Sequence, residues 1–167
     1  MTKEQINSLL YNGIFPETTV KRELIETHIS WVIICDQFVY KIKKPVQYSF
    51  LDFSTLEMRK HFCEREIELN KRLTDNVYID VQPICERQGI LRIGSKEGSL
   101  LDFAVRMHKL DREKQMDILL SKNMVTGQDI KNLAEKIAFF HKNTEIIYKK
   151  DFLDIQAKFN DMAAEGE

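Results

Sequence analysis

Residues 38–45 of this 167-residue chain decide its fold, and they read Phe-Val-Tyr-Lys-Ile-Lys-Lys-Pro. Side chains along a β-strand alternate between the two faces of the sheet, so Val39, Lys41 and Lys43 share one face of this predicted strand. A lysine in the middle of an apolar strand is unusual, because burying an unpaired ammonium costs considerable free energy. Lys41 therefore needs either solvent or a carboxylate partner.

The segments on both sides of this strand predict a sheet and one long helix. Bulky and β-branched residues in period two predict three strands over residues 20–42, whose short connections favour an antiparallel meander. Ser54 and Glu57 have the spacing of a capping box and predict a helix that runs to about Asp75. Further strands are predicted over Val81–Cys85, Ile90–Ile93 and Leu100–Met107.

Helices are predicted at both ends of the chain. The capping-box pair Thr2 and Gln5 opens a first helix that should end at Asn12-Gly13. After residue 110 the pattern is helical, with predicted helices over 116–120, from Thr126 to about 140, and over Phe152–Met162. The order predicts an α+β fold: a mainly antiparallel sheet of about five strands with one long packed helix, then a short helical segment.

Composition limits the classes of function that need to be considered. An apolar fraction of 43% and a charged fraction of 31% are typical of a globular protein. There are 25 basic and 26 acidic residues, which gives a net charge of −1. Proteins that neutralise nucleic-acid phosphates usually carry a basic surplus, so no nucleic-acid partner is expected.

The three cysteines indicate a reducing compartment. Cys35, Cys63 and Cys85 are odd in number, widely spaced and located in apolar runs, which favours buried free thiols over a metal or catalytic role. The N-terminus has no charged-then-apolar signal segment, and apolar stretches such as residues 31–35 are too short to cross a bilayer. We therefore expect a cytoplasmic protein with no membrane partner.

The predicted helix after the lysine strand offers carboxylates to Lys41. Glu64 follows Cys63, a position on the apolar stripe of that helix, so Glu64 can lie at the edge of the packed face. Two interpretations are open: Lys41 extends to solvent from a strand end, or it forms a functional ion pair with Glu64. Asp102 and Arg106, four apart on one strand face, are expected to form a local charge pair.

The order of the elements favours the functional interpretation. A strand with an inward lysine, a helix with a glutamate, two strands and an extended linker is the plan of a protein-kinase-like N-lobe. Three stretches are more specific: Glu-Thr-His-Ile-Ser-Trp-Val at 26–32, Val-Tyr-Lys-Ile-Lys-Lys-Pro-Val at 39–46 and Phe-Leu-Asp-Phe-Ser-Thr-Leu-Glu at 50–57. From about Val20 to Thr144, the chain resembles a family of uncharacterised bacterial aminoglycoside-phosphotransferase-like proteins.

The resemblance implies roles for individual residues. Lys41 matches the lysine that holds the α and β phosphates of ATP, and Glu64 matches the helix glutamate that orients it. Val39 matches the apolar residue above the adenine ring. Lys43 and Lys44 match the family's Lys-Lys-Pro motif, and their expected place is a solvated strand end.

The same resemblance implies a division of the chain. Residues 1–107 would be the N-lobe with its N-terminal helix, and Met107 would be the last strand residue before a hinge over residues 108–111. The hinge backbone at Lys109 and Leu110 would contact adenine. Residues 112–167 would be the helical start of a truncated C-lobe.

Two departures from the family pattern bear on function. The turn over residues 27–30 reads Thr-His-Ile-Ser, so no glycine-rich loop covers the phosphates. The 167 residues also lack a His-Gly-Asp catalytic loop and a later metal-binding Asp. The resemblance implies ATP and Mg²⁺, with a small-molecule hydroxyl as phosphoryl acceptor, for a complete family protein. Because of the two departures, this chain alone should bind nucleotide weakly at most.

A different class of function stays open. The chain could be a standalone, non-catalytic module that uses the sheet as a binding or interaction surface. A lobe without its partner lobe exposes apolar surface, which self-association tends to cover, so a homodimer or a swapped assembly is expected.

Overall fold

The computed structural model describes residues 1–145. The chain divides into two compact units, one over Met1–Lys109 and one that begins at Leu110, and each is described by itself. The boundary falls inside the segment 108–111 for which a hinge was predicted. The helix predicted over Phe152–Met162 lies outside the described residues.

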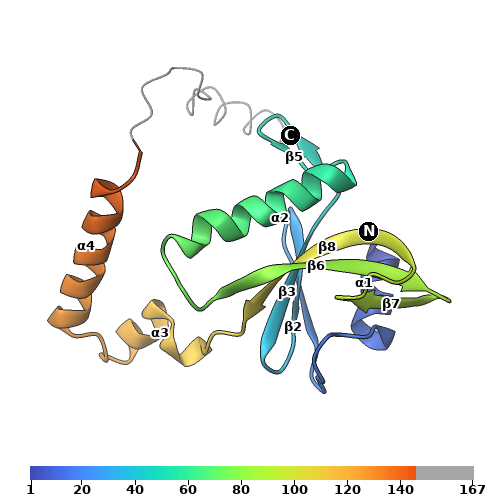
Figure 1. Cartoon of the computed structure of the whole chain (residues 1–167). Coiled ribbons are helices and arrows are strands. Elements are labelled where there is room, and N and C mark those ends of the chain that lie inside the picture. Colours follow the sequence, from blue (N-terminus) through green and yellow to red (C-terminus); the bar gives the residue numbers. More distant parts are fainter. Residues whose placement is uncertain (146–167) are drawn as a thin grey trace, which may run out of the picture. The chain divides into compact units, whose positions relative to one another are not determined.

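The first unit is built on a six-stranded antiparallel sheet with the order β1-β2-β3-β8-β6-β7 (Figure 1). The strands are β1 (Glu23–Glu26), β2 (Ser30–Ile34), β3 (Phe38–Lys43), β6 (Tyr78–Arg87), β7 (Ile90–Ile93) and β8 (Ser99–His108). The predicted α+β class is confirmed. A separate hairpin of β4 (Gln47–Tyr48) and β5 (Leu51–Asp52) was not predicted, because strands of two residues carry no periodic pattern.

Two helices accompany the sheet, α1 (Lys3–Asn12) and α2 (Leu56–Lys71). The capping box between Thr2 and Gln5 is present, as predicted. The N-cap of α2 is Thr55 rather than Ser54: the Thr55 hydroxyl accepts from the Met58 N–H at 3.2 Å. The Ser54 hydroxyl instead donates to the Asp52 carboxylate at 2.6 Å, a charge-assisted hydrogen bond. α2 ends at Lys71, earlier than the predicted Asp75.

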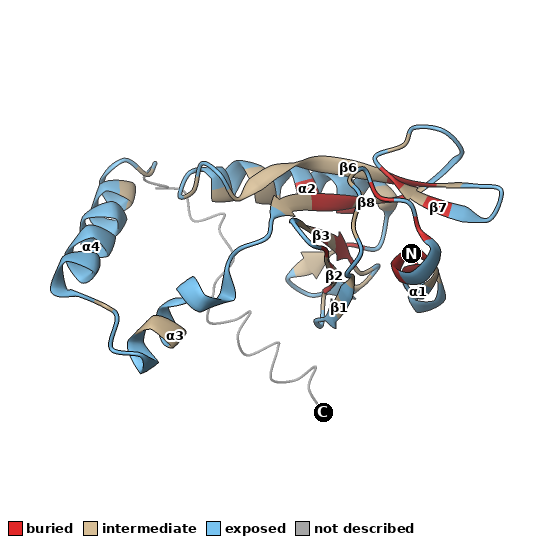
Figure 2. Cartoon of the chain, turned by 90° about the horizontal axis from the view of Figure 1, so that it is seen from below, coloured by how far each residue is buried: buried red, intermediate tan, exposed pale blue. Residues whose placement is uncertain are grey.

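The two faces of the sheet are covered unequally. The face that carries Tyr40 and Ile42 packs with α1 into a closed core, in which Ile6, Leu9 and Ile33 are also fully buried. Figure 2 shows buried residues at α1, at β7 and in the middle of β8. The opposite face receives α2, and most of its side chains on β2, β3 and β6 are only half-buried.

A buried ion pair fixes α2 to β8. Arg59 is 5% exposed and Asp102 is fully buried, and the Arg59 Nε lies 2.9 Å from the Asp102 Oδ1. The Met1 ammonium lies 2.9 Å from the Asp102 Oδ2. The predicted pair of Asp102 with Arg106 was wrong, because residues four apart on a strand are separated by about 13 Å. Arg106 instead binds Asp80.

The second unit contains three helical segments in its described part. They are a 3₁₀ turn η1 (Arg112–Lys114), α3 (Met116–Ser121) and α4 (Gly127–Lys142). α4 begins next to the predicted Thr126, and a capping box between Thr126 and Asp129 opens it. Within residues 1–145, none of the helices is both long enough and apolar enough to span a membrane.

Candidate functional site

Two lysines of β3 converge on one glutamate of α2. The Lys41 Nζ lies 2.9 Å from the Glu66 Oε1, and the Lys43 Nζ lies 2.7 Å from the Glu66 Oε2. Strand alternation explains the arrangement, because it places both lysines on the face that receives α2. Each carboxylate oxygen thus accepts a charge-assisted hydrogen bond from a different ammonium.

The glutamate at this position is not the predicted one. Glu64 is 55% exposed and forms a helix-surface pair with Lys60 at 3.7 Å. The helix phase explains the difference: Cys63 is fully buried, and a residue one position later points about 100° away from it. Glu66, three positions after Cys63, returns to within about 60° of the packed face and so reaches Lys41.

The two lysines differ in their access to solvent. The Lys43 side chain is 5% exposed, and its ammonium lies 4.8 Å from the centre of the Phe53 ring. The prediction of a solvated strand end for Lys43 was therefore wrong. The Lys41 side chain is 30% exposed, so it is the lysine of the pair that solvent reaches. Lys44 lies 2.7 Å from Glu26 and is mostly buried, so it is not a free strand end either.

The electrostatic state of the cluster follows from these contacts. Burial alone would raise the pKa of Glu66, but the hydrogen bonds from Lys43 and Lys41 outweigh it and hold this pKa below its ordinary value. Glu66 is therefore ionised at neutral pH. Two ammonium groups and one carboxylate leave one net positive charge. Burial, followed by the nearby Glu66 charge, raises the pKa of the Tyr78 hydroxyl on β6.

An apolar surface adjoins Lys41. Val39 on β3 and Met107 on β8 are directly opposite one another in the sheet, and both are half-buried. Residues opposite one another on neighbouring strands share a face, so both lie on the face of Lys41. The structure thus brings together three of the predicted site residues: Val39, Lys41 and Met107. A half-buried apolar pair beside a cation offers contacts to the aromatic part and the anionic part of a ligand.

One backbone group after β8 that was predicted to be available to adenine is already hydrogen-bonded within the protein. The Lys109 N–H donates to the carbonyl of Gln37 at 2.8 Å, so it is occupied in this structure. The carbonyl of Lys109 stays a predicted adenine contact. Leu110 is the first residue of the second unit and its side chain is exposed, and its predicted contact with adenine also stays a prediction.

The turn between β1 and β2 is closed by its own hydrogen bonds. The Thr27 hydroxyl accepts from the Ser30 N–H at 3.0 Å, and the Thr27 N–H donates to the Ser30 carbonyl at 2.9 Å. These two N–H groups therefore do not form the phosphate cradle that a glycine-rich loop provides. Recognition of phosphate on this face would depend on Lys41.

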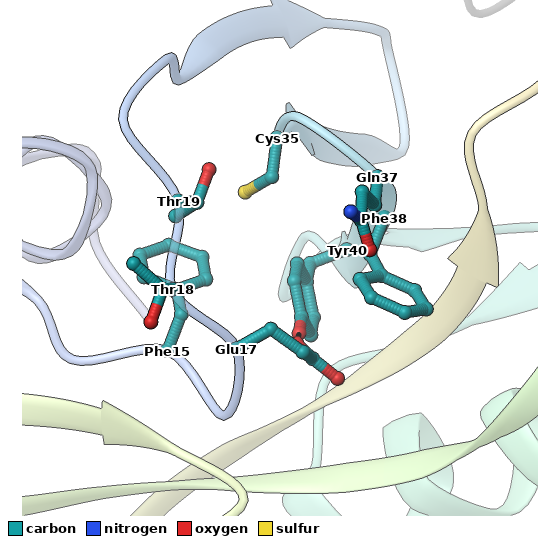
Figure 3. Close-up of a pocket in the computed structure, with 8 residues that line it drawn as sticks. All are labelled: Phe15, Glu17, Thr18, Thr19, Cys35, Gln37, Phe38 and Tyr40. Carbon is teal, nitrogen blue, oxygen red and sulfur yellow. Dashed lines mark hydrogen bonds between the residues drawn. The ribbon is translucent and has the colours of Figure 1, made fainter.

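A small pocket lies beside the turn between β2 and β3 (Figure 3), and it is unsuited to a nucleotide. Its volume is about 10 Å³, the lower limit for one water molecule. The Cys35 sulfur points into it, and burial raises the pKa of this thiol, so Cys35 is not poised as a thiolate nucleophile. The three cysteines are free and buried, as predicted.

The wall of this pocket belongs to a polar network that the sequence analysis missed. The Tyr40 hydroxyl donates to Glu17, and Arg106 bridges Glu17 and Asp80. Burial, and then the Glu17 hydrogen bond, raise the pKa of the Tyr40 hydroxyl. Glu17 and Arg106 are 89 residues apart, so no local pattern could have connected them. The network joins the 15–19 segment to β3 and β8.

The described residues contain no cluster of metal-ligating side chains. Within residues 1–145, no group of three or more His, Cys, Asp or Glu side chains is placed to hold a metal ion. Glu66 is the carboxylate closest to the Lys41 ammonium, and both of its oxygens already accept from lysines.

Comparisons with known proteins identify distant relatives. Uncharacterised proteins of Mycobacterium bovis and of two Mycobacterium tuberculosis strains are 28% identical to this chain over 120 residues. The aligned region covers 72% of this chain and 22% of each relative, so the chain spans about a fifth of their length. No family model and no solved structure matches. The chain is thus a distant homologue of one part of longer mycobacterial proteins.

Proposed function

We propose that this chain forms the nucleotide-binding sheet of an ATP-dependent phosphotransferase that resembles aminoglycoside phosphotransferases and acts on a hydroxyl of a small molecule. The observation that carries the proposal is the Lys41–Glu66 ion pair between β3 and α2. A lysine held in this way can place its ammonium against the phosphates of ATP.

Two further features of the same face support nucleotide as the ligand. The half-buried Val39 and Met107 lie beside Lys41 and could accept one side of an adenine ring. The cluster carries one net positive charge, and Lys41, at 30% exposed, is the more accessible of its two lysines. An ammonium at a partly desolvated position attracts a phosphate more strongly than one in bulk water.

The affinity of the isolated chain should nevertheless be low. A triphosphate carries several negative charges, and in this cluster the described residues offer it one accessible lysine and no group of three or more metal-ligating side chains. We expect a dissociation constant on the order of millimolar, which corresponds to about 4 kcal/mol. The sequence contains no His-Gly-Asp loop, so phosphoryl transfer by these 167 residues should be undetectable.

Isothermal titration with ATP and Mg²⁺ tests the proposal. Lys41→Met removes the proposed phosphate ligand, and Lys60→Met is the matched control, because it removes an exposed ammonium from α2. We expect weak binding by the wild type and the control and a loss of binding in Lys41→Met. Equal affinity of Lys41→Met and Lys60→Met would contradict the proposal. ATP turnover above background would contradict the expectation that these 167 residues lack a complete catalytic site.

A further inference from the structure

Lys43 has no role in the nucleotide site described so far, yet it is the more deeply buried member of the cluster. Its side chain is 5% exposed, against 30% for Lys41. The Lys43 Nζ is 2.7 Å from the Glu66 Oε2, and its ammonium also lies over the Phe53 ring at 4.8 Å. A buried ammonium is stable only with such compensation, so Lys43 and Glu66 form a tightly coupled pair.

The charge balance of the cluster depends on this second lysine. A cluster of Lys41 and Glu66 alone would be neutral, and a neutral pair attracts an anion weakly. Because Lys43 compensates Glu66 inside the protein, the Lys41 ammonium keeps one uncompensated positive charge while the Glu66 Oε1 still fixes its position at 2.9 Å.

We infer that Lys43 is a positioning residue that neutralises Glu66 from within the protein, so that Lys41 is both held in place and free to attract the phosphate groups of a ligand. The inference rests on the proposed function, in which Lys41 binds phosphate. It assigns to the second lysine of the Lys-Ile-Lys segment an electrostatic task that packing alone would not require.

The test measures binding of inorganic tripolyphosphate, without Mg²⁺ and at low ionic strength, by isothermal titration. Tripolyphosphate carries the phosphate charges but no adenine, so its affinity reports the electrostatic attraction alone. Lys43→Met makes the cluster neutral, as does Lys41→Met, so both should lose about tenfold in affinity. The double variant Lys43→Met/Glu66→Gln restores one net positive charge, and its affinity should return to within about threefold of the wild type.

Thermal unfolding of each variant separates the electrostatic role from a structural one. Lys43→Arg keeps the charge and changes the packing, so it should unfold at a lower temperature and still bind tripolyphosphate like the wild type. If Lys43→Met does not fold, the double variant and Lys43→Arg keep the inference testable, because weak tripolyphosphate binding by either of them would overturn it.

Failure of this inference and failure of the proposed function give different results. Wild-type affinity in Lys43→Met, with Lys41→Met still weakened, would overturn the role of Lys43 and leave the proposed function standing. A double variant as weak as Lys43→Met would also overturn it. Equal tripolyphosphate binding by the wild type and Lys41→Met would overturn both.

Discussion

The two ends of α2 hold the sheet through ion pairs of opposite character. Near its start, Arg59 and Asp102 are 5% and 0% exposed, and the Arg59 Nη1 also donates to the carbonyls of Phe53 and Ser54. Near its end, Glu66 joins two lysines of β3, and the Lys41 side chain is 30% exposed.

The difference assigns a separate task to each end of α2: one end anchors the helix to the sheet, and the other can offer a cation to a ligand. A buried charge must have all of its hydrogen bonds satisfied, and the Arg59 end meets this requirement without leaving a group for a ligand. The Glu66 end has one more ammonium than carboxylate, and its Lys41 side chain is partly exposed to solvent. The same helix can therefore fix the fold at one end and offer a cation at the other.

The largest expected effect on stability comes from a substitution at the Arg59 end of α2. Asp102→Asn removes the negative charge from a site that Arg59 and the Met1 ammonium share, and it leaves the buried guanidinium without a counter-ion. We expect the free energy of unfolding to fall by about 3–5 kcal/mol in denaturant titrations. Glu64→Gln, an exposed control on the same helix, should change it by less than about 0.5 kcal/mol. A loss of less than about 1 kcal/mol in Asp102→Asn would show that the pair does not anchor α2.

A substitution at the Glu66 end of α2 should reduce stability less. Glu66→Gln leaves Lys43 buried without a carboxylate, whereas Lys41 can turn towards solvent. We expect a loss of about 2–3 kcal/mol in the free energy of unfolding. The contrast between the two ends of α2 would break down if this loss exceeded that of Asp102→Asn.

The pH dependence of stability distinguishes Glu66 from its neighbours on the helix surface. The pKa of Glu66 is held below its ordinary value in the folded protein, so the unfolded chain binds this proton more readily. Its contribution is therefore fully present above the unfolded-state pKa of about 4.3 and is lost as the pH falls through and below that value.

Protonated Glu66 resembles glutamine, so the wild type and Glu66→Gln should converge in their free energy of unfolding as the pH is lowered from about 6 to about 3. The measurement is a series of denaturant titrations at fixed ionic strength. A difference that stays constant over this range would mean that Glu66 gains no stability from its two lysines.

Among the variants of the two ion-pair sites, Lys41→Met has the smallest expected effect on stability. Glu66 keeps its hydrogen bond to Lys43, and the lost ammonium is partly exposed. We expect a change of about 0.5–1 kcal/mol in the free energy of unfolding, although this residue carries the proposed ligand contact. A loss as large as that of Glu66→Gln would place Lys41 with the anchoring groups instead.

Patterns local to one element could be predicted from the sequence. Alternation along β3 placed Val39 and Lys41 on one face, and the capping box at Thr2 marked the start of α1. These predictions hold because strand and helix periods depend on neighbouring residues. The lysine itself was identifiable because an ammonium inside an apolar strand requires a partner.

Contacts between distant elements could not be predicted in the same way. Glu64 was expected to pair with Lys41, but the helix phase that turns Glu66 towards the sheet depends on how Cys63 packs against it. The partner of Asp102 is Arg59, 43 residues away and on another element. Both errors concern relative placement, which tertiary packing determines.

The most direct test of the account is a titration of the isotopically labelled chain with ATP and Mg²⁺, followed by backbone amide chemical shifts. The central claim is that the Glu66 end of α2 and the adjoining strands form the ligand site. We expect the largest shifts over residues 39–43 of β3 and at Met107, with none at Arg59 or Asp102. Shifts that cluster at the Arg59 end or around the Cys35 pocket, or a spectrum that does not respond to ATP, would contradict it.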